Sequence, residues 1–128
     1  MRAYLPIRQS DLSNFIVKRS FEIERVFAPT KTFIEANQDC DEEEIEYLLS
    51  VLAGEAALEL RNSKTSPGIV LAIDLDDSVC AESYEDSIAL AGVLAWDQVQ
   101  CALLSHEGED ELVWFATQEI SQELDSWK

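Results

Sequence analysis

The chain has little basic charge, few glycines and only one histidine, and these shortages narrow its chemistry. Nine lysines and arginines face 26 aspartates and glutamates, so the formal net charge at pH 7 is −17. Such a surface repels phosphate backbones, which argues against direct nucleic-acid binding. The four glycines form no phosphate-binding loop. No apolar run approaches the roughly 20 residues needed to span a bilayer, and the start has no signal-peptide pattern. We therefore expect a soluble cytoplasmic protein without membrane contact.

The cysteines and the single histidine do not form a metal-binding pattern. Cys40, Cys80 and Cys101 are far apart in the sequence, whereas zinc ligands usually come in closely spaced pairs. An odd number of separated cysteines is typical of reduced, mostly buried thiols. We expect no cofactor.

The acidic charge is concentrated after residue 38. Residues 1–38 hold six basic and four acidic residues, whereas residues 39–128 hold three basic and 22 acidic residues, so the two parts carry +2 and −19. Two interpretations stay open. The acidity can simply keep a small protein in solution, or it can form a surface that binds a basic protein partner or imitates the charge of DNA.

Residues 41–62 carry the clearest secondary-structure pattern. Apolar residues from Ile45 to Leu60 recur at helical spacing on one stripe. Asp41 and Glu44 fit a capping box, which indicates that the acids of residues 41–44 mark a helix start. Consecutive helical residues point in different directions, so these acids are not expected to surround a metal ion.

The remaining pattern predicts an α+β fold in one domain over residues 1–128, with a mixed β-sheet of about five strands packed by three to four helices. It opens with a strand–helix–strand unit and closes with an antiparallel hairpin. Pro6 is expected to stop the first strand, Ser10 to cap the first helix and Thr30 the second. The main strands are expected at residues 2–7, 21–28, 69–75, 98–105 and 111–119, with residues 88–94 as a candidate for a further short strand. The other helices are expected at 10–19 and from 30 to about 37.

The stretch I-V-L-A-I-D-L-D-D-S-V at residues 69–79 raises an enzymatic alternative. A buried strand that ends in Asp74 and Asp76 resembles the nucleophile motif of haloacid-dehalogenase-type phosphatases. Such a site also needs a cation for the phosphoryl oxygens, and the only basic residue after Val79 is Lys128. With Asp77, the two aspartates are candidate ligands of a divalent metal ion. A metal-dependent phosphatase-like enzyme is therefore an alternative function.

The segment E-L-V-W-F-A-T-Q-E-I at residues 111–120 is apolar on both faces of the expected strand, which is typical of a core strand. If one face is open, Trp114 beside Gln118 forms an aromatic and amide patch of the kind enriched in protein interfaces. Glu119 and Tyr47 complete the set of candidate partner-binding residues.

Three motifs together resemble an uncharacterised family of small actinobacterial proteins, known only as a domain of unknown function. They are M-R-A-Y-L-P at the start, D-E-E-E-I-E-Y at residues 41–47, and the W-F-A-T-Q-E-I segment near the end. The resemblance implies a compact α-plus-β domain of a cytoplasmic bacterial protein and carries no activity, ligand or catalytic residue. Our leading hypothesis is a non-catalytic interaction or regulatory domain that binds a basic protein. The alternatives are the phosphatase-like enzyme and a DNA-mimic inhibitor.

Overall fold

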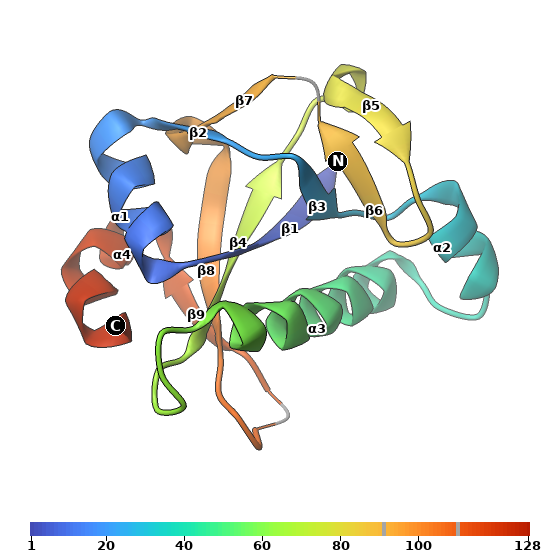
Figure 1. Ribbon diagram of the computed structural model, residues 1–128. Helices are drawn as coiled ribbons and strands as arrows, with labels where there is room; N and C mark the ends of the chain where they lie inside the picture. Colours follow the sequence, from blue (N-terminus) through green and yellow to red (C-terminus); the bar gives the residue numbers. More distant parts are fainter. Residues whose placement is uncertain (91, 110) are drawn as a thin grey trace.

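A computed structural model describes residues 1–90, 92–109 and 111–128. The fold is α+β, as expected, and is built on a seven-stranded sheet (Figure 1). The strands of this sheet are β1 (Arg2–Ile7), β3 (Arg25–Phe27), β4 (Gly68–Asp74), β5 (Cys80–Ser83), β6 (Ser87–Leu90), β8 (Val99–Ser105) and β9 (Val113–Ala116). Their order is β5-β6-β3-β1-β4-β8-β9. A second sheet pairs β2 (Ser20–Glu22) with β7 (Val93–Ala95).

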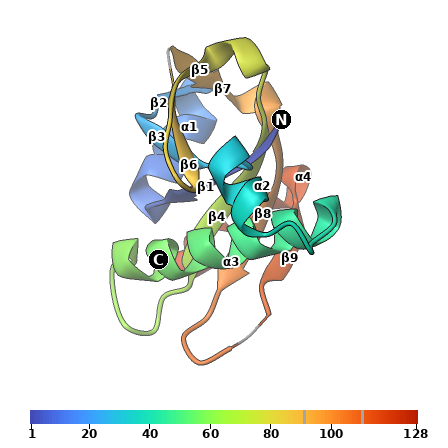
Figure 2. The same cartoon turned by 90° about the vertical axis from the view of Figure 1, so that its right-hand side faces the viewer.

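The helices lie on both faces of the main sheet (Figure 2). They are α1 (Gln9–Lys18), α2 (Lys31–Ala36), α3 (Glu42–Leu60) and α4 (Thr117–Glu123), with short 3-10 turns η1 (Asp77–Val79), η2 (Trp96–Gln98) and η3 (Leu124–Trp127). In the described residues every strand pairing is antiparallel. The expected mixed sheet is therefore wrong in that detail, because α1 leads into the separate β2–β7 sheet and not into a parallel neighbour of β1.

The structure has more strands than the sequence pattern predicted, because two expected strands are divided and one strand was not expected. The expected strand at residues 21–28 is divided into β2 and β3, which belong to different sheets. The expected strand at 88–94 is likewise divided between β6 and β7, with Ala91 outside the described residues. The acidic segment at 76–87, read as a loop, contains η1 and the edge strand β5. Its side chains are mostly exposed, so no hydrophobic alternation marks it in the sequence.

Strand β4 is the centre of the core, and its expected burial on both faces is confirmed. Ile69, Leu71 and Ile73 join the cluster beneath α1, α4 and the small sheet. Val70 and Ala72 join the cluster beneath α3. Both clusters are apolar, and this explains why β4 reads as an unbroken hydrophobic run.

Helix α3 starts as expected. The Asp41 carboxylate accepts a hydrogen bond from the Glu44 backbone N–H at 2.9 Å, and the Glu44 carboxylate accepts one from the Asp41 N–H at 3.4 Å. These two bonds form the capping box that the sequence indicated. Thr30 caps α2 through the Phe33 N–H, also as expected.

Two expected boundaries are wrong. The N-cap of α1 is Arg8 and makes no side-chain cap bond, whereas Ser10 lies inside the helix. Pro6 does not end β1, which continues to Ile7 along β4. On its other side β1 is in register with β3 only at Tyr4, so Pro6 lies where the missing N–H of proline is tolerated.

The strand expected at residues 111–119 ends at Ala116, where α4 begins. The Glu119 carboxylate accepts a hydrogen bond from the Ala116 N–H at 2.9 Å. This contact turns the chain from the edge of the sheet into the helix. The expected closing hairpin of β8 and β9 is confirmed as an antiparallel pair.

Candidate interaction groove

The structure brings two of the four candidate partner-binding residues into one groove. Tyr47 projects from the first half of α3, and Trp114 projects from β9. Their side chains are 56% and 60% exposed, which is unusual for large aromatic residues. Gln118 and Glu119 lie on α4, so the strand alternation that placed Gln118 beside Trp114 does not extend to them.

The aromatic groove, as we call it, has a volume of about 300 Å³. Its floor is the face of β4 and β8 beside α3, where Ala72, Cys101 and Leu103 lie. The Glu43 and Glu46 side chains line it from α3. The groove therefore combines exposed aromatic rings with carboxylates.

The position of β9 explains why Trp114 is uncovered. β9 is at one end of the sheet order and pairs with β8, with Leu103 opposite Trp114. α3 packs mainly on β1, β4 and β8. Side chains alternate along a strand, so Phe115 points to the other face, where its ring contacts Trp127 at a centroid distance of 5.1 Å. One face of β9 is thus core and the other is open.

The titratable groups in the floor of the groove are held in their protonated forms at neutral pH. Burial, together with the nearby Glu46 carboxylate, raises the pKa of Tyr4 to about 12. Burial also raises the pKa of the Cys101 thiol, although the Trp114 side chain acts in the opposite direction. A protonated buried thiol is a poor nucleophile, so Cys101 is not activated for covalent chemistry in this groove.

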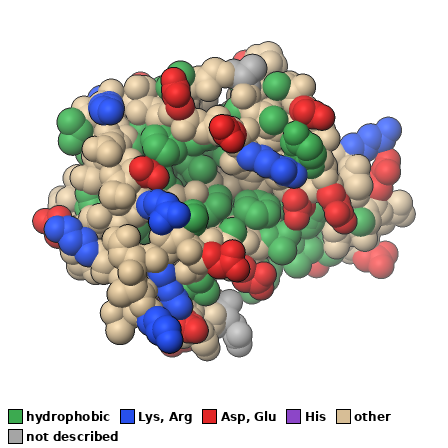
Figure 3. All heavy atoms as spheres, in the orientation of Figure 1, with side chains coloured by type: hydrophobic (Ala, Val, Ile, Leu, Met, Phe, Trp, Pro, Cys, Tyr) green, Lys and Arg blue, Asp and Glu red, His purple; other side chains and the backbone are tan. Residues whose placement is uncertain are grey.

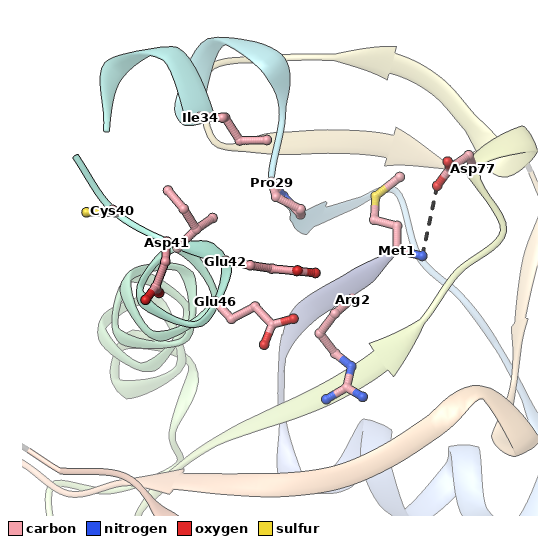
Figure 4. Close-up of a pocket in the computed structure, with 10 residues that line it drawn as sticks. Met1, Arg2, Pro29, Ile34, Cys40, Asp41, Glu42, Glu46 and Asp77 are labelled. Atoms are coloured by element: carbon pink, nitrogen blue, oxygen red, sulfur yellow. Dashed lines mark ion pairs between the residues drawn. The ribbon is translucent and has the colours of Figure 1, made fainter. Parts of the chain in front are cut away.

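A second hollow adjoins the aromatic groove, because Arg2 and Glu46 line both. It lies between the start of β1, α2 and the first turns of α3 (Figure 4) and has a volume of about 570 Å³. We call it the aliphatic hollow, since Pro29, Ile34 and Ile45 form much of its wall. In Figure 4 the side chains of Glu42, Glu46 and Arg2 point into the space between α3 and β1.

The three aspartates of the candidate metal site have separate partners. The Asp74 carboxylate accepts a 2.9 Å hydrogen bond from Arg2 Nε, which raises the pKa of Arg2. Asp76 caps η1 by accepting a bond from the Ser78 N–H, and this bond lowers the pKa of Asp76. The Asp77 carboxylate lies 3.9 Å from the Met1 amino group. Among the residues that the structure describes, no group of three or more His, Cys, Asp or Glu side chains could hold a metal ion. The geometry therefore gives no support to a metal centre or to an Asp74 nucleophile.

Charges of both signs are present at the surface. Figure 3 shows one face, in the orientation of Figure 1, on which basic and acidic side chains are mixed. In the part of the chain that the structure describes, Glu42, Glu43 and Glu46 form no ion pair. Any electrostatic preference of the groove therefore depends on these local carboxylates more than on the net charge.

Sequence reasoning missed Glu43, Glu46 and Ile34 as residues of this region. A signal was present, since Glu42 and Glu46, and likewise Glu43 and Tyr47, are four residues apart and so share faces of α3. Like charges at that spacing destabilise an isolated helix by roughly 0.2–0.5 kcal/mol. A paired acidic face beside an exposed tyrosine indicates a binding surface better than the total acid count does.

Comparisons with known proteins place the chain in a family without assigning it an activity. No curated protein and no solved structure shows significant similarity to it. No helix within the described residues is long and apolar enough to cross a membrane. Of the three motifs quoted above, those at residues 1–6 and 41–47 lie within the stretch matched by a known family, and the third lies beyond it. Residues 1–109 match the family of unknown function DUF6912, and the chain belongs to this family.

Proposed function

We propose that the protein is a non-catalytic interaction domain that binds a basic segment of a protein partner in the aromatic groove. The observation that carries this proposal is the meeting of Tyr47 and Trp114, both more than half exposed, in one groove lined by Glu43 and Glu46. Tyrosine and tryptophan are enriched where interfaces are energetically strong.

The chemistry of the groove suits cationic side chains. The face of an aromatic ring attracts a guanidinium or ammonium group, by about 0.5–1 kcal/mol at exposed sites. The Glu43 and Glu46 carboxylates provide opposite charge beside the rings. Within the described residues no lysine or arginine of the chain forms an ion pair with these carboxylates, although Arg2 also lines the groove, so a partner's cation can pair with them.

The proposal includes a reducing, cytoplasmic setting. All three cysteines are free thiols, and two of them are partly exposed. Free thiols are typical of proteins kept in a reducing compartment.

The proposal is tested by affinity capture with immobilised protein at low and high salt. We expect the wild type to retain a basic partner at low salt and to release it as salt rises, because exposed charge pairs are screened. Trp114→Ala should lose the partner. Val17→Ala is the matched control, since Val17 is 79% exposed on α1 and lies outside the groove.

A second pair of variants separates local charge from net charge. Glu43→Gln with Glu46→Gln should weaken capture, whereas Glu55→Gln with Glu59→Gln removes the same charge from exposed positions of α3 outside the groove and should not. Equal losses with both pairs, or full retention by Trp114→Ala, would contradict binding in the groove.

A further inference from the structure

The aliphatic hollow has apolar walls and an acidic rim, and the proposed function leaves it unused. Ile34 of α2 is 47% exposed there, although it is a large aliphatic residue. Ile45 and Pro29 continue the apolar wall. The volume of about 570 Å³ is more than one aliphatic side chain needs, and hollows of this size commonly hold ligand groups.

The hollow and the aromatic groove adjoin along the first half of α3. Arg2 and Glu46 belong to both. The Arg2 guanidinium is bonded to Asp74, so its charge is already partly neutralised. Glu42 lines the hollow, Glu43 lines the groove and Glu46 lines both, so α3 contributes carboxylates to both along one side.

This arrangement fits an extended peptide better than separate small ligands. Cationic side chains can meet the carboxylates of α3 and the ring of Trp114, while a neighbouring apolar side chain enters the hollow beside Ile34. Side chains that fill a pocket and lose their water contribute strongly to affinity, and charges at the edge contribute orientation and association rate.

We propose that the partner's basic segment also carries an aliphatic residue, which inserts into the hollow formed by Ile34, Ile45 and Pro29. This inference rests on the proposed function, and it assigns the sequence specificity of the site to the hollow. The groove selects for positive charge, and the hollow selects for an aliphatic side chain next to that charge.

The test uses two blocked synthetic peptides, one an arginine run with a single central leucine and the other the same run with serine in place of leucine. Affinity is measured by titration calorimetry. We expect the wild type to bind the leucine peptide about tenfold more tightly, as burial of one leucine side chain allows. Ile34→Ala should reduce this preference and leave the affinity for the serine peptide unchanged. Val17→Ala should keep both affinities.

The outcomes separate the two proposals. Equal binding of both peptides to the wild type would overturn the aliphatic hollow while leaving the basic groove standing, and so would an equal loss for both peptides in Ile34→Ala. If Trp114→Ala weakens both peptides by the same factor, the groove and the hollow act as proposed. If neither peptide binds, or if Trp114→Ala binds both normally, the proposed function fails and this inference fails with it.

Discussion

Tryptophan side chains are buried on one face of the sheet and exposed on the other. Beneath α1, α4 and the small sheet, Trp96 and Trp127 are 9% and 3% exposed and contact the rings of Phe15 and Phe115. On the face covered by α3, Trp114 is 60% exposed. One face is closed by several elements, whereas the other is closed by α3, which packs mainly on β1, β4 and β8, together with Phe33 of α2. The uncovered aromatic residue lies at one end of a wide sheet and not in the most acidic segment, and this end is where we propose that a partner binds.

The largest effect that would test this comparison is the removal of a buried tryptophan. Trp96→Ala should lower the free energy of unfolding by about 3–5 kcal/mol, because it leaves a cavity beside Phe15. Trp114→Ala is the matched change on the open face and should lower it by less than about 1 kcal/mol. Urea unfolding followed by circular dichroism measures both. Similar losses would show that Trp114 is a core residue.

A smaller effect is expected where α3 approaches β4. A Cβ on Gly68 would lie 2.8 Å from the backbone nitrogen of Leu58, so Gly68→Ala should lower the free energy of unfolding by about 1–3 kcal/mol. Gly54→Ala is the control, because its nearest contact is the end of the flexible Leu112 side chain and alanine favours the helix by about 1 kcal/mol. Thermal unfolding should therefore rank Gly54→Ala above Gly68→Ala, and the reverse ranking would contradict the close approach.

Tyr4, in the floor of the groove, should make the stability of the protein depend on pH in the alkaline range. Its pKa is raised from 10.0 to about 12 in the folded protein. Between these values the unfolded state has lost the proton that the folded state keeps, so the free energy of unfolding falls as pH rises, by about 3 kcal/mol in all. The contribution is fully present below pH 10. Urea unfolding from pH 9 to pH 12 measures it, and Tyr4→Phe should flatten this part of the profile.

The smallest expected effect on stability belongs to a variant of Trp114 that changes mainly the fluorescence of the protein. Acrylamide should quench mainly Trp114, since Trp96 and Trp127 are buried. Trp114→Phe should therefore remove most of the quenchable emission with little change in stability. The leucine-containing arginine peptide should protect wild-type Trp114 from acrylamide, and quenching that stays the same at saturating peptide would place the peptide elsewhere.

The parts of the fold that are predictable from sequence are those that local chemistry determines. The capping box of Asp41 and Glu44 and the hydrophobic run of β4 follow from residue types alone, and both are confirmed. The strand pairing does not follow, because α1 can lead equally to a parallel neighbour or to a second sheet. The division of residues 21–28 between two sheets is decided by β6 and β7, which come sixty or more residues later than their partner residues.

The candidate site was predictable only in part, for the same reason. Tyr47 and Trp114 were identified as candidates by their residue type and motif, but their meeting depends on how α3 crosses the sheet. Gln118 was paired with Trp114 by strand alternation, and α4 interrupts that alternation at Thr117. The aspartates at 74, 76 and 77 resemble an active site in sequence, yet each has a different neighbour in space. DNA mimicry stays a prediction, since an acid count carries no information on the spacing of charges.

The hydrogen bond from the Ala116 N–H to Glu119 bears on whether another chain can pair with the edge of the sheet. β9 has only four residues and is an outer strand of the sheet, a position that normally invites another chain to extend the ladder and start an aggregate. The Glu119 carboxylate already occupies the Ala116 N–H and places a negative charge at that border. We therefore expect this end of the outer strand to resist self-association, even though Trp114 of the same strand is exposed.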